Sequence, residues 1–510
     1  MKMNFNCENE KTSDTSMGNY LNELTLDSVL SLEDEIAKMN VINLFRIEAT
    51  KNNKLKEFEE LYKSRKAKFN TIQQCSYLKT KANGEIIVNT SLLAEYIRQN
   101  YYYFIAKKQG SETCLIYWYE DGYYKLLSSN ELKAKIKSFI PLEIAKPGMW
   151  ENVYKDLLAT DDFISFDELN TDEDLINFKN GLLNIKTNEF FAHSPKYKFT
   201  IQLNCEYHPN SNKTAYNWLN YIKTLTDNDE EMQKTLQEWL GLILSNLNAN
   251  LTKKAIALYG PVGNTGKSKF INIIVELIGI NNVCTTPIQD LSNRFGAAAL
   301  YGTKCVAIDD QKSASIEDGS LFKSITGCGP IQVELKNKDP FPYTYRGGFS
   351  ITCNALPYIK DDKGSHMFDR FLIIPCNNVI EKSKQDKLLL NKLLKEKDEI
   401  ALWALEGLQR LIQNNFNLTE SQASIEANIE YRKMNDSFFR FINEYYELSN
   451  DKDAKIKKTE LENEYLRFCK MNSIQALDKK NIVERAKANG IICKKTSGIF
   501  FYFGLKNKIV

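Results

Sequence analysis

AIALYGPVGNTGKSKFINIIVELIG, residues 255–279, is the most informative stretch of this 510-residue chain. The apolar run from Ala255 to Leu258 predicts a strand, which leads through a glycine-rich loop into an amphipathic helix. This context is typical of a phosphate-binding loop, because backbone N–H groups and the helix N-terminus together cradle phosphates. Lys267 is expected to reach the β- and γ-phosphates of ATP and to support no core, and Ser268 to ligate Mg²⁺.

The spacing of this loop departs from the usual pattern GxxxxGK[ST] in one respect. The first glycine of that pattern would fall on Pro261, whereas Gly260 lies one residue earlier. Either the loop is one residue longer, or Gly263 supplies the flexibility. The predicted nucleotide-binding residues are Gly260, Gly263, Asn264, Thr265, Gly266, Lys267 and Ser268.

An acidic pair follows the next apolar run, in the segment TKCVAIDDQ at residues 303–311. The run from Cys305 to Ile308 predicts a buried strand that ends in Asp309 and Asp310. In an open α/β sheet, residues at this end of a strand lie beside the ligand crevice. We expect Asp309 to hold the Mg²⁺ shell and Asp310 to orient or deprotonate the attacking water.

Two more polar residues lie at predicted strand ends. Asn354 ends the strand in GGFSITCNALPYI and is placed to contact the γ-phosphate or the water, while Arg370 directly precedes the strand-like run FLIIP. A single Asn or Arg is more often a surface cap or an ion pair. Four such positions in order within about a hundred residues favour a shared nucleotide site.

This series of motifs resembles the superfamily 3 helicases of the AAA+ class. The resemblance is closest to the primase-helicase family of poxviruses and satellite phages, and to replication initiators of phages and phage-inducible chromosomal islands; it covers roughly residues 100–510. It implies an AAA+ core, a parallel sheet flanked by helices, and a homo-hexameric ring. Similar helicases carry an arginine finger after the sensor Asn. Of Arg294, Arg346 and Arg370, only Arg370 follows Asn354, so Arg370 is expected to be the finger; Arg294 is the second choice.

Two basic segments are expected to contact DNA. VELKNKDPFPYTY, residues 333–345, predicts two strands around a tip with Lys336 and Lys338. Such a tip suits the phosphates of a strand that threads a ring pore, and in similar helicases this hairpin tracks DNA; a solvated turn is the alternative. Spacing does not choose between the two lysines.

The C-terminal residues 452–510 contain 14 Lys or Arg and 6 Asp or Glu, a balance of 14 − 6 = +8. Helix, turn, helix and a strand pair follow in the order of a winged-helix domain, with Asp478 as an N-cap. A small capping domain with a basic exterior is the alternative. Four residues are expected to face duplex DNA and two to lie at the wing: Lys479, Lys480, Arg485 and Lys487, then Lys494 and Lys495.

Composition limits the remaining possibilities. No apolar run approaches the ~18 residues of a membrane span, and the N-terminus lacks the apolar region of a signal peptide. The 11 Cys are scattered singly and the three His (His193, His208, His366) have no partners at metal-ligand spacing, so free thiols in a reducing cytosol, that of a bacterial host, are expected.

The predicted organisation has six parts. They are a partly disordered helical segment (1–100), an α+β domain (101–213), a helical collar (214–250), the α/β AAA+ core (251–375), a helical segment (376–431) and a winged-helix domain (432–510).

The leading functional hypothesis is an ATP- and Mg²⁺-dependent ring helicase that acts on single- and double-stranded DNA and initiates replication at an origin. A primase-helicase with polymerase activity is the second hypothesis, although no strand ending in Asp-x-Asp occurs before residue 100. An AAA+ remodeler that does not act on DNA is the third.

Overall fold

A computed structural model describes residues 76–81, 86–107, 114–293, 295–312, 315–316, 319–336, 338–359, 368–449, 451 and 454–508, with isolated positions between 42 and 63. The chain divides into two compact units, residues 1–105 with 127–163 and residues 106–126 with 164–510. Within the described ranges, no helix combines the length and apolar character needed to cross a membrane. Three predictions lie outside the described residues: the disorder within residues 1–100, Arg294 as the second choice for the arginine finger, and His366.

A five-stranded parallel sheet forms the centre of the larger unit, in the order β10-β11-β15-β9-β17. Its strands are β9 (Ala255–Tyr259), β10 (Val283–Cys284), β11 (Cys305–Ile308), β15 (Gly348–Cys353) and β17 (Phe371–Pro375). Almost every residue in them is buried, as expected of a parallel sheet covered on both faces. The predicted α/β architecture with a parallel sheet flanked by helices is confirmed.

One face of this sheet packs on four helices. Ile256 and Leu258 of β9 and Leu372 of β17 lie in a single apolar core with side chains of these helices. The helices are α8 (Tyr216–Leu225), α9 (Glu230–Leu244), α10 (Lys267–Ile278) and α14 (Lys397–Gln413). The helical segment predicted directly before the phosphate loop is thus present as α8 and α9.

The opposite face is covered by α12 (Ser320–Ile325) and α15 (Gln422–Asn435). The ring of Phe322 on α12 lies 5.3 Å from that of Phe349 and 5.0 Å from that of Phe371. Tyr431 on α15 places its ring 5.9 Å from Phe371 and donates to the carbonyl of Pro357 at 2.7 Å. Because strand residues alternate between faces, Phe371 faces these helices while Leu372 faces the other core.

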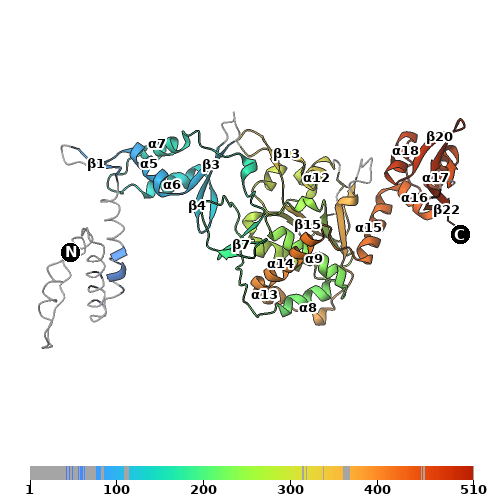
Figure 1. Cartoon of the computed structure of the whole chain (residues 1–510), viewed down its shortest axis with the longest axis horizontal. Coiled ribbons are helices and arrows are strands. Elements are labelled where there is room, and N and C mark those ends of the chain that lie inside the picture. The colour runs from blue at the N-terminus through green and yellow to red at the C-terminus, as the bar shows by residue number, and fades with distance from the viewer. Residues whose placement is uncertain are drawn as a thin grey trace. The chain divides into compact units, whose positions relative to one another are not determined.

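Helices α9 and α14 run side by side against the sheet (Figure 1) and approach closely through two glycines. A Cβ atom on Gly241 would lie 2.2 Å from the carbonyl oxygen of Ala404, and one on Gly407 would lie 2.4 Å from the carbonyl carbon of Gln237. Trp239 of α9 also donates its indole N–H to the Ser350 hydroxyl of β15 at 2.8 Å. The helix pair is therefore fixed both to itself and to the sheet.

The segment before the sheet is rich in strands, as predicted. β4 (Cys114–Glu120) and β5 (Tyr123–Leu127) flank a turn at Asp121 and Gly122, whose φ angles of 56° and 93° are left-handed. A second antiparallel sheet contains β6 (Leu175–Phe178), β7 (Gly181–Asn184) and β8 (Phe190–Phe191).

In the smaller unit, three helices pack together: α5 (Thr90–Asn100), α6 (Ser129–Ser138) and α7 (Met149–Leu158). Arg98 of α5 joins α7 through an ion pair with Asp156 at 2.7 Å. Among the described residues before the C-terminal part, the other α-helices and strands are β1 (Leu78–Thr80), β2 (Ile86–Val88), β3 (Tyr103–Lys107), α11 (Ile288–Leu291), β12 (Ser315–Ile316), β13 (Pro330–Val333), β14 (Phe341–Thr344), β16 (Tyr358–Ile359) and α13 (Leu389–Leu394).

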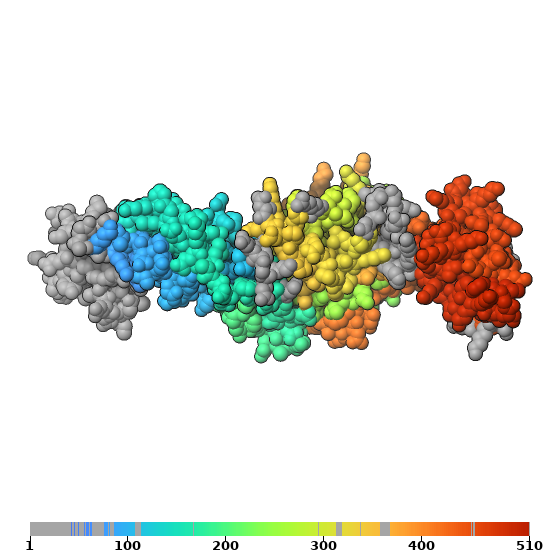
Figure 2. Space-filling view, turned by 90° about the horizontal axis from the view of Figure 1, so that it is seen from above, coloured from blue at the N-terminus to red at the C-terminus, as the bar shows by residue number. Residues whose placement is uncertain are grey.

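The C-terminal residues form a core of their own, drawn in red in Figure 2. Its helices are α16 (Ser437–Tyr445), α17 (Lys458–Met471) and α18 (Lys479–Ala488), and its strands are β18 (Tyr446–Leu448), β19 (Lys455–Lys457), β20 (Ile492–Thr496), β21 (Ile499–Phe503) and β22 (Leu505–Asn507). The predicted order of two helices and a strand pair is present. Asp478 caps α18 as predicted, because its carboxylate accepts from the N–H of Asn481 at 2.8 Å.

Gly407→Ala and Gly241→Ala should each lower the melting temperature measured by circular dichroism. An alanine is favoured over a glycine within a helix by about 1 kcal/mol, so a loss of stability has to come from the clash between α9 and α14. Overpacking of this kind costs about 1–3 kcal/mol. Gln413→Ala at an exposed position of α14 is the control and should leave the melting temperature unchanged; a rise for both glycine variants would contradict the close packing.

Candidate functional site at the carboxyl edge of the sheet

Three adjacent strands bring most of the predicted site residues to one edge of the sheet. β9 ends at the glycine-rich loop, β15 ends before Asn354, and β11 ends before Asp309 and Asp310. The ends are aligned, since Cys353 pairs with Tyr259 and Ile308 pairs with Ile351 in the parallel ladders. β15 lies between the other two strands, so Asn354 lies between the loop and the acidic pair.

The glycine-rich loop begins at Gly260. A Cβ atom there would lie 2.5 Å from the carbonyl oxygen of Cys376 and 3.0 Å from Lys267 Nζ, so only a glycine fits. A Cβ atom on Gly263 would meet nothing within 4 Å. The loop therefore starts at Gly260 and is one residue longer than the strict spacing, and it turns through left-handed conformations at Asn264 (φ 63°) and Gly266 (φ 90°).

Lys267 is buried, with 7% of its surface exposed, at the first position of α10. Its ammonium group donates to the carbonyl of Gly260 and to the hydroxyl of Thr265, both at 3.1 Å, and more weakly to the carbonyl of Val262 at 3.4 Å. These hydrogen bonds connect the Lys267 side chain to atoms of the loop itself. Ser268, the next residue, is exposed.

The acidic pair is held by hydrogen bonds from β15. The Thr352 hydroxyl donates to Asp309 Oδ1 at 2.7 Å and accepts from the backbone N–H of Asp310 at 2.8 Å. Asn354 donates from its side-chain amide to Asp310 Oδ1 at 3.3 Å. Asp309 and Asp310 remain exposed, and Asp310 has a left-handed φ of 52°. The predicted sensor and the predicted acidic residues are thus direct neighbours.

The pKa of the Cys353 thiol at the end of β15 reflects two opposite charges near it, those of Lys267 and Asp310. Burial raises the pKa of Cys353 to about 12; the Lys267 ammonium lowers it, and the Asp310 carboxylate raises it. Both charged groups therefore lie within electrostatic range of the end of β15. A positive group and two carboxylates at one exposed edge can hold a polyanion together with a divalent cation, because carboxylate and hydroxyl oxygens are the ligands that Mg²⁺ prefers.

Tyr221 of α8 also contacts the loop, although no sequence motif pointed to it. Its hydroxyl donates to the carbonyl of Gly266 at 3.0 Å. Burial holds the pKa of Tyr221 well above its usual range, and the charges of Cys376 and Asp309 raise it further, so the hydroxyl stays a donor. A tyrosine on the apolar side of an amphipathic helix gives no signal that separates this contact from ordinary packing.

Arg370 lies at the other end of the sheet. It directly precedes β17, whose first residue Phe371 pairs with Ala255 at the start of β9, whereas Pro375 pairs with Tyr259 beside the loop. The five residues of β17, at about 3.3 Å each, separate Arg370 from that loop. Its guanidinium donates instead to the carbonyl of Thr326, at the end of α12, at 2.6 Å. The structure therefore does not bring Arg370 together with Lys267.

The predicted basic hairpin is present. β13 and β14 pair antiparallel, and Val333 opposite Phe341 closes the ladder. Lys336 and Lys338 lie in the connecting turn, and both are exposed.

The predicted DNA-facing residues of the C-terminal part divide into two groups. Those that are exposed are Lys479, Lys480, Lys487, Lys494 and Lys495. Arg485 is buried, with 8% of its surface exposed, and its guanidinium lies 3.6 Å from the carboxylate of Asp436, which is itself 2% exposed. The expectation that Arg485 faces DNA is therefore wrong: on α18 it points into the domain while Lys487 points out.

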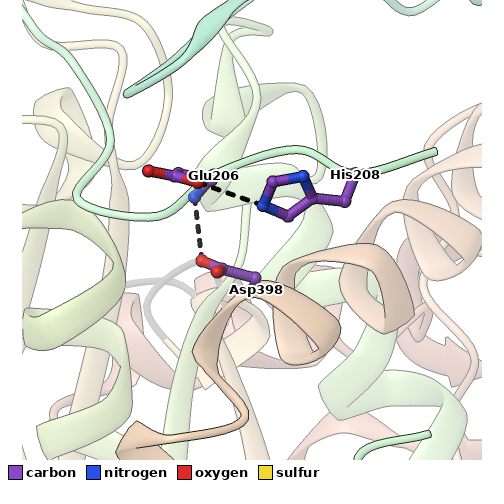
Figure 3. Close-up of side chains that lie close together, drawn as sticks. All are labelled: Glu206, His208 and Asp398. Carbon is purple, nitrogen blue, oxygen red and sulfur yellow. Dashed lines mark hydrogen bonds and ion pairs between the residues drawn. The ribbon is translucent and has the colours of Figure 1, made fainter. Parts of the chain in front are cut away.

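One cluster outside this site combines His and acidic side chains (Figure 3). His208 Nε2 lies 3.1 Å from a carboxylate oxygen of Glu206, and Asp398 accepts from the backbone N–H of Glu206 at 2.8 Å. The expectation that His208 has no such partners is thus corrected: one carboxylate comes from Glu206, two residues away, and the other from Asp398 of α14, which is distant in the sequence. These direct contacts tie residues 206–208 to the first turn of α14.

Two family models match the chain. Residues 33–244 match the model described as D5 N terminal like, and residues 258–370 match a family of unknown function, DUF5906. The first match agrees with the resemblance to phage-type primase-helicases and extends it upstream of residue 100. The second covers the loop, the acidic pair, Asn354 and Arg370.

Solved structures of the NrS-1 C-terminal region are also similar. The A form of the apo structure is 12% identical, with 80% of this chain and 97% of that chain covered at a TM-score of 0.43. The apo structure of residues 305–718 of that protein is 12% identical, with 82% and 99% covered at a TM-score of 0.43.

Arg485→Ala should destabilise the C-terminal part and leave Asp436 as an unpaired buried charge. Removing one partner of a buried ion pair costs about 3–5 kcal/mol, so thermal unfolding should begin at a clearly lower temperature. Lys487→Ala is the matched control, because this lysine is exposed on the same helix and its loss should leave the melting temperature unchanged. Equal melting temperatures for both variants would contradict a stabilising ion pair between Arg485 and Asp436.

Proposed function

We propose that the chain is an ATP-dependent DNA helicase of the superfamily 3 AAA+ class, which works as a homo-hexameric ring and initiates replication at an origin. The observation that carries this proposal is the shared carboxyl edge of β9, β15 and β11. There a buried lysine in a phosphate loop, an amide and two carboxylates lie next to one another. The strand order supports the same proposal, because β15, which ends at the predicted sensor Asn354, lies between the loop strand β9 and the acidic strand β11.

The residues of this edge have separate roles in the proposal. The loop from Gly260 to Ser268 would hold the phosphates of ATP, with the Lys267 ammonium turned from loop carbonyls to the β- and γ-phosphates. Ser268 and Asp309 would ligate the Mg²⁺ that accompanies the nucleotide. Asp310 would accept the proton of the attacking water, and Asn354, bound to Asp310, would report the state of the γ-phosphate to β15.

Bound ATP supplies the reactive γ-phosphate and changes contacts at this edge when it is hydrolysed. The Thr352 hydroxyl fixes both acidic residues through direct hydrogen bonds. Tyr221 fixes the loop from the side of α8. A change at the phosphate is therefore coupled to β15, and through the hairpin β13–β14 that precedes β15 to the lysines proposed to contact DNA.

The position of Arg370 supports a ring. A guanidinium that stabilises the transferred phosphoryl group can contribute about 10³–10⁵ in rate, but Arg370 lies at the end of the sheet away from its own loop. We infer that it serves the loop of a neighbouring subunit. The proposed hexamer places one such arginine at each interface.

Two surfaces are proposed to bind DNA. The exposed Lys336 and Lys338 would follow the strand in the pore, and the C-terminal part would act as a winged-helix domain that recognises duplex origin DNA through Lys479, Lys480 and Lys487, with Lys494 and Lys495 at the wing. A remodeler without a DNA substrate would lack DNA-stimulated ATPase activity. A primase-helicase with polymerase activity would extend primers on a single-stranded template.

Lys267→Ala should reduce ATPase and unwinding activity by at least about 10², comparable to the loss of one main electrostatic stabiliser. A phosphate-release assay with and without forked DNA measures the effect. Lys269→Ala, two residues further along α10, is the matched control and should retain normal activity. Because Lys267 also forms hydrogen bonds within the loop, melting curves of both variants without nucleotide should accompany the assay. Near-normal hydrolysis by a folded Lys267→Ala variant would contradict the assignment of the ATP site.

An equal mixture of Arg370→Ala and Lys267→Ala subunits should recover part of the ATPase activity that each variant lacks alone. If Arg370 acts on the neighbour, about a quarter of the interfaces in a randomly mixed ring join an intact loop to an intact finger. Activity measured across mixing ratios, with subunit exchange shown independently, tests this arrangement. No recovery at any ratio would mean that Arg370 acts within its own subunit or not at all.

A further inference from the structure

The three-stranded sheet of the C-terminal part has one face of which the winged-helix assignment uses only Lys494. Its strand order is β19-β21-β20, and its register aligns two rows of residues. One row contains Lys455, Phe503 and Ile492, and the other contains Lys457, Phe501 and Lys494. We call these six residues the outer face.

The opposite side of the same sheet fixes the direction of these side chains. The row between the two contains Ile456, Tyr502 and Cys493, which pack in the C-terminal core. Because side chains alternate along a strand, the two flanking rows point away from that core. The lysines and Ile492 are exposed, and Phe501 and Phe503 are half-buried, so both rings are accessible in part.

The outer face combines aromatic rings with positive charge. The ring centroids of Phe501 and Phe503 lie 6.4 Å apart, with planes inclined by 62°. Lys455 Nζ lies 5.4 Å from the centre of the Phe501 ring. The two rows contain three lysines and no acidic residue.

This combination narrows the chemistry of the ligand. Phe501 and Phe503 both lie on the outer side of a strand and are partly accessible. This is unusual, because the solvent-facing side of an antiparallel sheet normally carries polar residues. A purely apolar partner would leave three ammonium groups without anions, and a simple anion would leave the rings exposed. Unpaired bases on a phosphate backbone satisfy both, since bases stack on aromatic rings and phosphates bind lysines.

We propose that the outer face is a binding site for single-stranded DNA, separate from the duplex-binding surface of α18. Phe501 and Phe503 stack on two unpaired bases, while Lys455, Lys457 and Lys494 contact the flanking phosphates. Stacking requires bases that are not paired, so duplex DNA does not stack on Phe501 and Phe503, and Lys494 is the one residue shared with the proposed wing. The choice of DNA over RNA rests on the proposed function, whereas the site itself depends on neither ATP nor ring formation.

Fluorescence anisotropy of the full-length protein without nucleotide tests the proposal, with a labelled oligothymidylate of about 16 nucleotides and a duplex of the same length. Phe501→Ala with Phe503→Ala should weaken binding of the oligothymidylate at least about tenfold and binding of the duplex less than about twofold. Replacing the three lysines by glutamine should lower the slope of log K against log[salt] for single-strand binding by about 2, since each phosphate contact on a single strand contributes about 0.7.

A second double variant separates stacking from folding. Phe501→Leu with Phe503→Leu keeps apolar side chains at both positions, and it should bind the oligothymidylate as weakly as the alanine variant while it melts like the wild type. Wild-type affinity in this variant, or equal losses for single strand and duplex, would overturn the proposal. Unchanged DNA binding with altered sedimentation would assign the face to contact between copies of the chain. Equally tight binding of an oligouridylate, lost in the same variants, would overturn the assignment to DNA. Loss of single-strand binding here with normal Lys267-dependent ATPase activity would leave the proposed function intact.

Discussion

The parallel backbone ladder of β9, β15 and β11 is the constraint on which the candidate site depends. Parallel pairing in register makes these strands end at one edge, where the glycine-rich loop, Asn354 and the acidic pair each follow a strand end. The ladder itself is stabilised by burial on both faces, through the α8–α9–α10–α14 core on one side and the Phe322 and Tyr431 contacts on the other. The absence of a side chain at Gly260 then allows the backbone of Cys376, directly after β17, to lie against the start of the loop.

The parallel sheet also separates the two groups of residues that the proposed hydrolysis requires. Residues at the carboxyl edge are proposed to bind ATP, whereas Arg370 lies at the amino end of β17, bound to Thr326. A single subunit therefore offers a loop at one end of the sheet and a guanidinium at the other. Assembly into a ring would bring one half of each site from each neighbour, which would make hydrolysis depend on the interface.

Local sequence predicted the parts of the structure that local physics determines. The strands β9, β11 and β15 and the Asp478 cap each follow from a few adjacent residues. Contacts over long distances in the chain were not accessible in this way: Arg485 meets Asp436, Tyr221 meets Gly266, and Asp398 meets Glu206. A basic residue on a short amphipathic helix gives no sign of which face is covered, so Arg485 and Lys487 looked equivalent until their burial was known.

A structure of the assembled protein with Mg²⁺, DNA and a non-hydrolysable ATP analogue, determined by electron cryo-microscopy, tests the central claim most directly. The account predicts a γ-phosphate in contact with Lys267 and Asn354 of one subunit and with Arg370 of the next. A γ-phosphate bound away from the carboxyl edge of the sheet, or with Arg370 of the same subunit, would contradict it.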